Sequence, residues 1–331
     1  MASIGEVARR AQVSVATVSR VLNHSDKVRE ETREAVMRAI DELHYTPNML
    51  GIGLRRCASG VVIVSMTTMS NLLYATMVEG VNACAAQHGY RVLLSVTDGD
   101  PAREREAYEM ARLKLAEGVL ALTTVIDGDT LNRYAAEIPI VRCCRHPLEA
   151  QVAAVLTDDR EGAYEAVCRL RELGRRRIAC MTIASELEVV GSDREEGYRR
   201  AMQEGGLPVP EGYVVYSGYA FSAGLEESRR LLEAHPKVDA VFCATDIMAF
   251  NTIKVLHSLG RRIPEDVCVI GYDNSPYALL SSPPMTSVDQ DSFRIGYRAM
   301  ERLLAKMAGE DDTADTRFVP HCLVERASTA V

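Results

Sequence analysis

Apolar residues recur at helical spacing through the first 22 residues of the chain. The positions i, i+3, i+4 and i+7 of one helical face are occupied by Ile4, Val7, Ala8 and Ala11. Ser3 and Glu6 have the S-x-x-E spacing of a capping box, which favours a helix start. A second apolar stripe follows Ser14, a good N-cap residue, and consists of Val18, Val21 and Leu22. The pattern predicts two short helices joined by a tight turn.

The second predicted helix carries small and polar side chains opposite its apolar stripe, namely Val15, Ala16, Thr17, Ser19 and Arg20. This arrangement is typical of a helix-turn-helix, whose second helix lies in the major groove of DNA. Arginine can read guanine there, a small apolar side chain can contact a thymine methyl group, and hydroxyls suit phosphates. Gln12 falls in the turn, where a left-handed backbone costs a non-glycine residue about 1–2 kcal/mol. The alternative is a purely structural helix pair.

A third helix is predicted over residues 30–43, with one apolar face made of Val36, Ala39, Ile40 and Leu43. Pro47 then suits the first turn of a new short helix. We therefore expect an all-α helix-turn-helix headpiece over residues 1–46 and a hinge helix or linker over residues 47–59.

After Gly60 the pattern changes to short apolar runs that alternate with helical segments. The first set has predicted strands at residues 61–66, 91–96, 118–122 and 139–144, with helices at 75–88 and 101–116. The second set has strands at 177–182, 213–217, 240–245 and 267–272, with helices at 161–173, 193–204, 222–234 and 246–259. The alternation predicts two parallel α/β lobes, each with four strands. Such sheets bind ligands beyond the carboxyl ends of their strands, so two facing lobes predict a small-molecule cleft.

Polar side chains near these strand ends are the candidate contacts for a small molecule. They are Thr68, Arg194, Tyr219, Thr245, Asp246 and Asp273. Two of them have a plainer interpretation, because Asp246 is a good N-cap residue and Thr68 can be an ordinary loop residue.

Charge is distributed unevenly along the 331 residues, whose net charge is −8. Residues 1–60 hold nine Lys or Arg against seven Asp or Glu, a net charge of +2, and the remainder has a net charge of −10. A mildly basic head on an acidic body can bind phosphate at one end only.

Cysteine usage points to a reducing compartment. There are nine Cys and no C-x-x-C pair, and the chain opens without an apolar signal region. We expect a cytoplasmic protein without a membrane segment. Cys143, Cys144 and His146 are close in sequence, but no second ligand pair follows at a defined spacing, so we expect neither a metal nor a cofactor.

Sequence strings spread over nearly the whole chain match a single known family. The headpiece strings are SIGEVARRAQVSVATVSRVLN and VREETREAVMRAIDELHYTPN, followed by the leucine of GIGL. Shorter strings follow in the same order, namely GYRVLL, DPAREREA, LGRRRIA, DREEGYRRAM, FCATDIMAF, IPEDVCVIGYDN, MTSVDQD and LVERAST. By these strings the chain resembles the lactose-repressor/galactose-repressor (LacI/GalR) family of bacterial regulators.

The resemblance implies a two-lobed periplasmic-binding-protein-like domain for effector binding and dimerisation over residues 60–331. The first lobe would comprise about 60–157 and 291–317, and the second about 158–290 and 318–331. In the headpiece, the base-reading positions are Val15, Ala16 and Arg20, and the phosphate-contacting positions are Asn23, Lys27 and Thr32. Leu54 matches a hinge leucine that inserts into the minor groove and kinks the operator.

The resemblance also assigns roles in the cleft. Arg194 and Asp273 match positions that hydrogen-bond the effector, and Tyr219 matches an aromatic residue that stacks on it. Leu73 and Tyr74 match contacts from the first lobe. With Leu72 and Leu73 after Ser70 and Asn71, the first-lobe wall is expected to be more apolar than in typical sugar-responsive members.

The hinge departs from the family pattern because Gly51 and Gly53 stand in a helix of about nine residues. Each glycine costs about 1 kcal/mol relative to alanine, and so short a helix is marginal by itself. We therefore predict that residues 48–55 are disordered off DNA and fold only on the operator, if the hinge folds at all.

These observations predict a DNA-binding transcriptional regulator, a repressor, that acts as a homodimer on a near-palindromic operator. A small-molecule effector, by preference a sugar or sugar derivative, would control it. One alternative effector is a nucleoside or purine acting as co-repressor, and another function is a small-molecule-binding module without DNA binding. An α/β enzyme is disfavoured, because no G-x-S-x-G, P-loop or G-x-G-x-x-G string follows a predicted strand.

Overall fold

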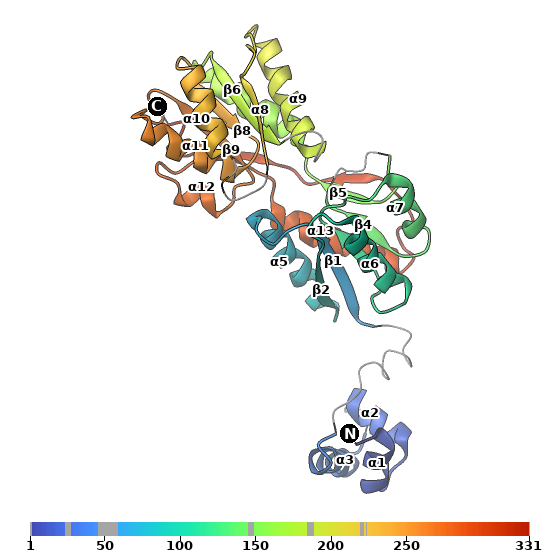
Figure 1. Cartoon of the computed structure of the whole chain (residues 1–331). Coiled ribbons are helices and arrows are strands. Elements are labelled where there is room, and N and C mark those ends of the chain that lie inside the picture. The colour runs from blue at the N-terminus through green and yellow to red at the C-terminus, as the bar shows by residue number, and fades with distance from the viewer. Residues whose placement is uncertain are drawn as a thin grey trace. The chain divides into compact units, whose positions relative to one another are not determined.

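The computed structural model divides into two compact units, Met1–Ser59 and Gly60–Val331 (Figure 1). It describes residues 2–23, 28–45, 59–144, 149–183, 189–218, 222 and 224–330. The predicted hinge over residues 48–55 and its Leu54 lie outside these described residues. Each unit is described separately below.

The N-terminal unit contains the three predicted helices, which are α1 (Ile4–Arg10), α2 (Val15–Asn23) and α3 (Glu30–Glu42). The capping box at the start of α1 is confirmed, because the Ser3 N–H donates to Glu6 Oε2 over 2.6 Å and the Glu6 N–H donates to Ser3 Oγ over 3.3 Å. One buried cluster joins the helices and consists of Val7, Ala8, Val18, Val21, Val36 and Ala39. The apolar stripes read from the sequence therefore form one small core.

The turn between α1 and α2 is tight and partly left-handed. Gln12 has φ of 55°, as predicted for this position, and the Val13 N–H donates to the Ala8 carbonyl over 3.0 Å. Ser14 then caps α2, because its Oγ accepts the Thr17 N–H over 3.1 Å. These bonds fix the direction in which α2 leaves the turn.

The larger unit is built around two six-stranded sheets, which confirms the two-lobed α/β fold. The first sheet has the order β11-β5-β4-β3-β1-β2 with all strands parallel. Its strands are β1 (Val61–Met66), β2 (Arg91–Val96), β3 (Val119–Ala121), β4 (Ile140–Arg142), β5 (Ala154–Leu156) and β11 (Thr316–Phe318). Its helices are α5 (Leu72–Gln87), α6 (Pro101–Arg112), α7 (Gly128–Ala135) and α13 (Ser292–Met307). The expectation of four strands was therefore wrong for this lobe.

The second sheet has the order β12-β10-β9-β8-β6-β7, and only β12 is antiparallel to its neighbour. Its strands are β6 (Ile178–Ile183), β7 (Val214–Ser217), β8 (Ala240–Cys243), β9 (Cys268–Tyr272), β10 (Thr286–Asp289) and β12 (Cys322–Val324). Its helices are α8 (Asp159–Glu172), α9 (Val189–Glu204), α10 (Leu225–Ala234), α11 (Asp246–Ser258) and α12 (Pro276–Leu280). Here too β10 and β12 extend the four predicted strands to six.

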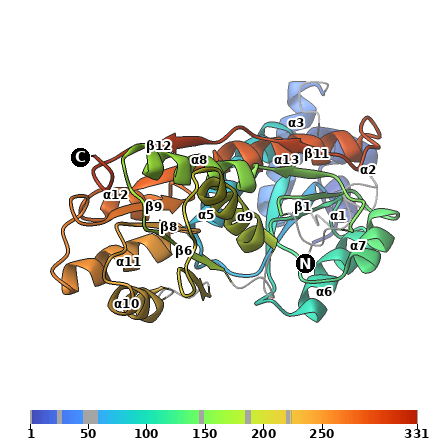
Figure 2. The same cartoon turned by 90° about the horizontal axis from the view of Figure 1, so that it is seen from above.

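The chain crosses between the two lobes three times. The crossings lie between β5 and α8, between β10 and α13, and between β11 and β12. Figure 2 shows the red C-terminal segment running from the first lobe to the second. Each lobe is therefore assembled from segments that are far apart in sequence.

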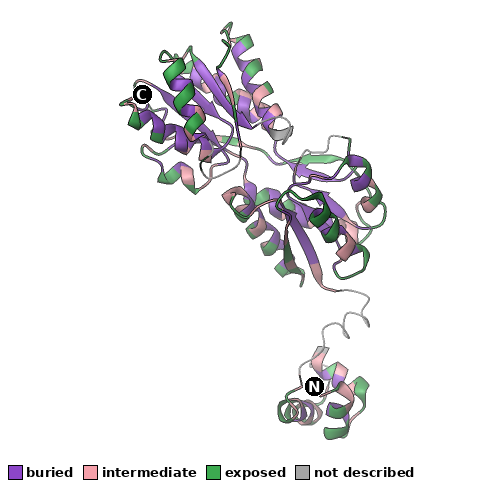
Figure 3. Ribbon diagram, viewed as in Figure 1, coloured by how far each residue is buried: buried purple, intermediate pink, exposed green. Residues whose placement is uncertain are grey.

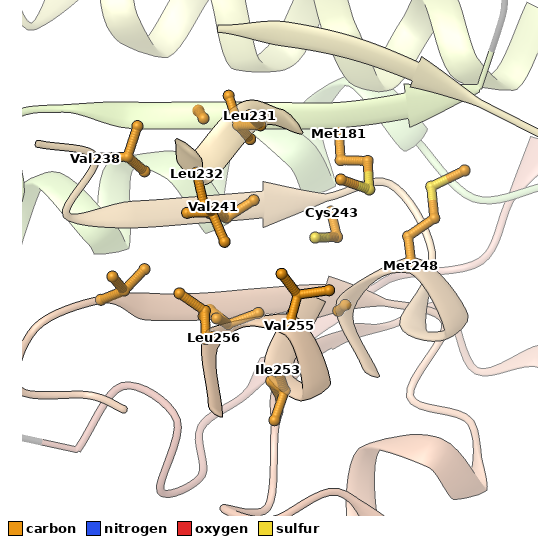
Figure 4. Close-up of a cluster of buried hydrophobic side chains, with 14 of the residues drawn as sticks. Met181, Leu231, Leu232, Val238, Val241, Cys243, Met248, Ile253, Val255 and Leu256 are labelled. Atoms are coloured by element: carbon orange, nitrogen blue, oxygen red, sulfur yellow. The ribbon is translucent and has the colours of Figure 1, made fainter. Parts of the chain in front are cut away.

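Buried strands form the centre of each lobe, and exposed residues cover the outer faces of the helices (Figure 3). In the second lobe, α10 and α11 pack on the sheet through a cluster that includes Met181, Val241, Met248 and Leu256 (Figure 4). No described helix is both long enough and apolar enough to cross a membrane.

The helices α5 and α13 approach each other closely enough to require glycine. A Cβ on Gly80 would overlap the backbone carbonyl oxygen of Phe293, and a Cβ on Gly296 would overlap that of Met77. These two helices form much of the first lobe around the cleft described next, so their crossing helps to fix its wall.

Candidate functional site

The N-terminal unit presents one side of α2 to solvent. Val15 is 41% exposed, and Ala16 and Arg20 are also exposed, while Val18 and Val21 on the opposite side are buried. The buried side anchors α2, so the exposed side is free to contact a partner. This is the surface that the sequence predicted for base reading.

The hydroxyl residues of the headpiece are less open. Thr17 and Ser19 are half-buried, and Thr17 Oγ1 lies 2.9 Å from Ser14 Oγ within the helix cap. Thr32 is half-buried on α3. Lys27 and the side chain of Asn23 lie outside the described residues.

The larger unit contains a cleft between its two lobes. The first lobe lines it with Asn71, Leu73, Tyr74, Met77, Leu122, Thr123, Cys143, Cys144, Leu156, Thr157 and Ile295. The second lobe and the crossing segments add Asp159, Ile183, Arg194, Thr245, Asp273 and Gln290. The first-lobe wall is mainly apolar, whereas the charged groups lie on the second-lobe side.

Arg194 is the centre of the polar side of the cleft, although it is only 3% exposed. Its Nε and Nη2 donate to Asp159 Oδ1 over 2.8 and 2.7 Å. Its Nη1 donates to the Ala244 carbonyl and to Asp273 Oδ1, the latter over 3.4 Å. The guanidinium also stacks 3.6 Å from the centre of the Tyr272 ring. Burial opposes the charge of Arg194, but the two carboxylates raise its pKa above its usual value. Arg194 therefore holds the polar side of the cleft together, in addition to lining the space that a ligand could occupy.

Asp273 lies at the end of β9 in a left-handed backbone conformation, with φ of 112°. Its Oδ1 accepts a hydrogen bond from Gln290 Nε2 over 2.7 Å as well as the one from Arg194. Burial raises the pKa of Asp273 to about 8, although Arg194 works in the opposite direction. Burial therefore moves the pKa of this carboxyl from its usual acidic range toward neutral pH.

This titration predicts a stability that depends on pH. The folded-state pKa of Asp273 is above its unfolded value of about 3.9, so protonation of this side chain favours the folded protein. The stability that it contributes is fully present below about pH 4 and is lost as the pH rises through about 8. Asp273→Asn cannot ionise and does not lose this stability. As the pH is raised from 5 to 9, we therefore expect the free energy of unfolding of the variant to increase relative to that of the wild type. Thermal denaturation of both proteins at each pH measures this difference. If the wild type instead became more stable relative to the variant as the pH rose, the raised pKa assigned to Asp273 would be wrong.

Thr245 and Asp246 have different places at the start of α11. Thr245 lines the cleft and is the N-cap, because its Oγ1 accepts the Met248 N–H over 3.3 Å. Asp246, which the sequence suggested as the cap, is the first helical residue, is 1% exposed and does not line the cleft. Its carboxylate accepts hydrogen bonds from Ser275 and Ser287 over 2.6 to 2.9 Å. Asp246 therefore ties α11 to neighbouring segments.

The remaining sequence-predicted contacts divide between the cleft and its surroundings. Leu73 and Tyr74 line the cleft from the start of α5. Thr68 does not line it, and its Oγ1 accepts the Ser70 N–H over 3.0 Å in a local turn. Tyr219 lies outside the described residues.

Sequence reasoning missed several residues of the cleft. Asp159, which binds Arg194, is the first residue of α8, and Gln290, which binds Asp273, lies between β10 and α13. Their partners are far away in the sequence, so no local pattern indicates these contacts. The polar ending of MTSVDQD was the available hint for Gln290. Cys143 and Cys144 also line the cleft. Among the described residues, which do not include His146, no group of three potential metal ligands occurs.

Two family models match the chain. The model described as "Bacterial regulatory proteins, lacI family" matches residues 3–48, and the model described as "Periplasmic binding protein-like domain" matches residues 167–329. The first match contains the exposed side of α2, and the second contains most of the polar side of the cleft.

Similar proteins extend these matches to the full chain. The chain is 39% identical over 324 residues to the HTH-type transcriptional regulator CelR of Thermobifida fusca, an alignment that covers 95% of this chain and 94% of that protein. A solved transcriptional regulator CelR–cellobiose complex has 33% identity and a TM-score of 0.75, and the match covers 99% of this chain and 100% of that one. The lac repressor dimer bound to operator and the anti-inducer ONPF shares the fold, with a TM-score of 0.89 at 23% identity and coverage of 100% and 99%.

Proposed function

This chain belongs to the LacI family of bacterial regulatory proteins, whose members are transcriptional regulators and not enzymes, and we propose that it acts as an effector-controlled repressor. In this proposal a homodimer places two α2 helices on the half-sites of a near-palindromic operator in the cytoplasm. A small molecule in the interlobe cleft then changes the affinity for the operator, and the operator must change the affinity for that molecule by the same factor.

The exposed side of α2 is the observation that supports this proposal most strongly. Its anchoring side is buried in the headpiece core, while Val15, Ala16 and Arg20 are exposed. Recognition helices use such small and arginine side chains to read base edges.

Exposed apolar side chains of the larger unit support the proposed dimer. Leu279 and Leu280 on α12 are 66% and 76% exposed, and Leu93 and Leu94 on the edge strand β2 are exposed as well. Exposed apolar surface on each lobe can take part in contacts with a second copy of the chain.

The proposed effector is a neutral sugar or sugar derivative. The cleft combines an apolar first-lobe wall with hydrogen-bonding groups from Thr123, Thr245, Asp273 and Gln290, a mixture that suits a ring with several hydroxyls. The similar CelR protein has been solved with cellobiose, which supports the carbohydrate class and makes cellobiose the first ligand to test.

Arg20→Ala tests the DNA-binding half of the proposal. A bidentate arginine–guanine contact contributes about 1–3 kcal/mol of discrimination, so we expect the affinity for the operator to fall about 30-fold for each half-site that the dimer contacts. The change should leave the stability of the headpiece unaffected, because Arg20 is exposed. The operator is first selected from random double-stranded oligonucleotides, and gel shifts then compare whole and single half-sites.

Arg10→Ala is the matched control for this experiment. It removes the same charge, but the Arg10 guanidinium is bound to Glu42 over 2.5 Å. Equal losses for the two variants, or equal affinity for whole and half operators, would contradict base reading by a dimer.

A further inference from the structure

Glu104 is a buried acidic residue that the proposed function leaves without a role. It lies in the first turn of α6, is 1% exposed, and has no ion-pair partner among the described residues. An ionised carboxylate so deeply buried is costly unless several donors satisfy it. The groups that donate hydrogen bonds to the Glu104 carboxylate therefore indicate the role of this residue.

Four hydrogen bonds connect Glu104 to its surroundings, and three of them come from the loop between β3 and α7. The Val125 and Ile126 N–H groups donate to Oε2 over 2.7 and 3.3 Å, and the Thr124 hydroxyl donates to Oε1. Tyr108 donates its hydroxyl to Oε1 over 3.0 Å from the next turn of α6. Burial and the nearby Glu104 raise the pKa of Tyr108 well above its usual value, so this hydroxyl remains a donor. One carboxylate thus fixes the path of the whole loop.

The same loop carries Thr123 to the floor of the cleft. Thr123 is 7% exposed, and its Oγ1 accepts the Thr67 N–H over 2.9 Å. In that hydrogen bond the Thr123 hydroxyl is the acceptor, so its own proton is not used. Within the described part of the chain, this proton has no acceptor. Thr123 can therefore donate a hydrogen bond into the cleft.

We propose that Thr123 is an effector-binding hydrogen-bond donor and that Glu104 is the positioning residue that holds it in place. This inference rests on the proposed function, because it assumes that the effector occupies the cleft. A hydroxyl or carbonyl oxygen of the effector accepts from Thr123 on the first-lobe side, opposite Arg194 and Asp273. Glu104 itself does not touch the effector, and acts only through the loop.

The first arm of the test needs no effector. Amide hydrogen exchange in the full-length protein is compared between the wild type and Glu104→Ala, with Glu106→Ala as the exposed control on the same helix. We expect the Val125 and Ile126 amides to exchange at least about tenfold faster in Glu104→Ala, while the Val119 amide in β3 is unchanged. Unchanged exchange at Val125 and Ile126 would overturn the positioning role.

The second arm uses calorimetric titration with cellobiose. We expect Glu104→Ala and Thr123→Val each to weaken binding about tenfold, and the double variant to be no weaker than the single ones, because both changes remove the same contact. Glu104→Gln keeps one acceptor for the loop amides and should recover part of the affinity. Additive losses, or a Glu104→Gln variant as weak as Glu104→Ala, would assign Glu104 a merely structural role.

The two arms also separate this inference from the proposed function. A wild type that does not bind cellobiose would count against the carbohydrate effector, while the exchange experiment still decides whether Glu104 fixes the loop. If cellobiose binds and Thr123→Val leaves its affinity unchanged, the carbohydrate effector stands but the donor role of Thr123 is overturned.

Discussion

Arg194→Ala is expected to lower the free energy of unfolding of the larger unit by about 3–5 kcal/mol and to abolish the response to the effector. The reason is that removal of Arg194 leaves the half-buried Asp159 carboxylate and the buried Asp273 carboxyl without their shared partner. The Ala244 carbonyl and Asp273 lose a donor at the same time. The loss exceeds the roughly 2 kcal/mol expected for one charged hydrogen bond to an effector. Urea unfolding followed by circular dichroism measures it in this chain, which has no Trp.

Two variants make this result specific. Arg199→Ala lies on the same helix, but Arg199 is 50% exposed and pairs with Glu195 of the same helix, so about 0.5 kcal/mol or less should be lost. Arg194→Lys keeps the charge beside Asp159 and should restore part of the stability, although lysine cannot reproduce the forked contacts. If Arg194→Ala were as stable as Arg199→Ala, the assigned ion pairs would be wrong.

Gly80→Ala is expected to destabilise the first lobe by about 3 kcal/mol, near the upper end of overpacking effects. The added methyl group would overlap the Phe293 carbonyl oxygen, and the Tyr297 nitrogen also lies only 2.9 Å from the Cβ position. Both are backbone atoms, so α5 and α13 must move apart. Alanine gains about 1 kcal/mol of helix propensity over glycine, and the measured loss is what remains after this gain. Chemical denaturation gives the value directly.

The same variant should weaken the effector response, because α5 carries Leu73 and Tyr74 and α13 carries Ile295 to the cleft. Glu79→Ala is the matched control, since Glu79 is the exposed neighbour on α5. A Gly80→Ala protein that is more stable than the wild type would mean that the helices have room for a side chain. The backbone overlap described for Gly80 would then be incorrect.

The sequence predicted those elements whose signal is local. The strands at 61–66 and 91–96 were predicted with the bounds that the structure gives, because continuous apolar runs lie between clear turn and cap residues. The capping box of Ser3 and Glu6 and the left-handed Gln12 are equally local features. The headpiece could therefore be read residue by residue.

Elements that depend on distant pairing could not be predicted in this way. The strands β5, β11 and β12 were not predicted, and they are defined by their partners across the sheets. The site shows the same limit. Arg194 and Asp273 were identified, but their partners Asp159 and Gln290 are brought to them by the crossings between lobes.

The late position of β11 and β12 has a consequence for synthesis on the ribosome. Residues 2–45 form their own core and can fold while the rest of the chain is still being translated. Neither large sheet gains its last edge strand until residues 316–324 have emerged. In a nascent chain the helix-turn-helix unit is therefore complete well before the unit with the proposed effector cleft. A chain that ends before residue 316 would keep the proposed DNA-binding unit but would lack the last strand of each large sheet.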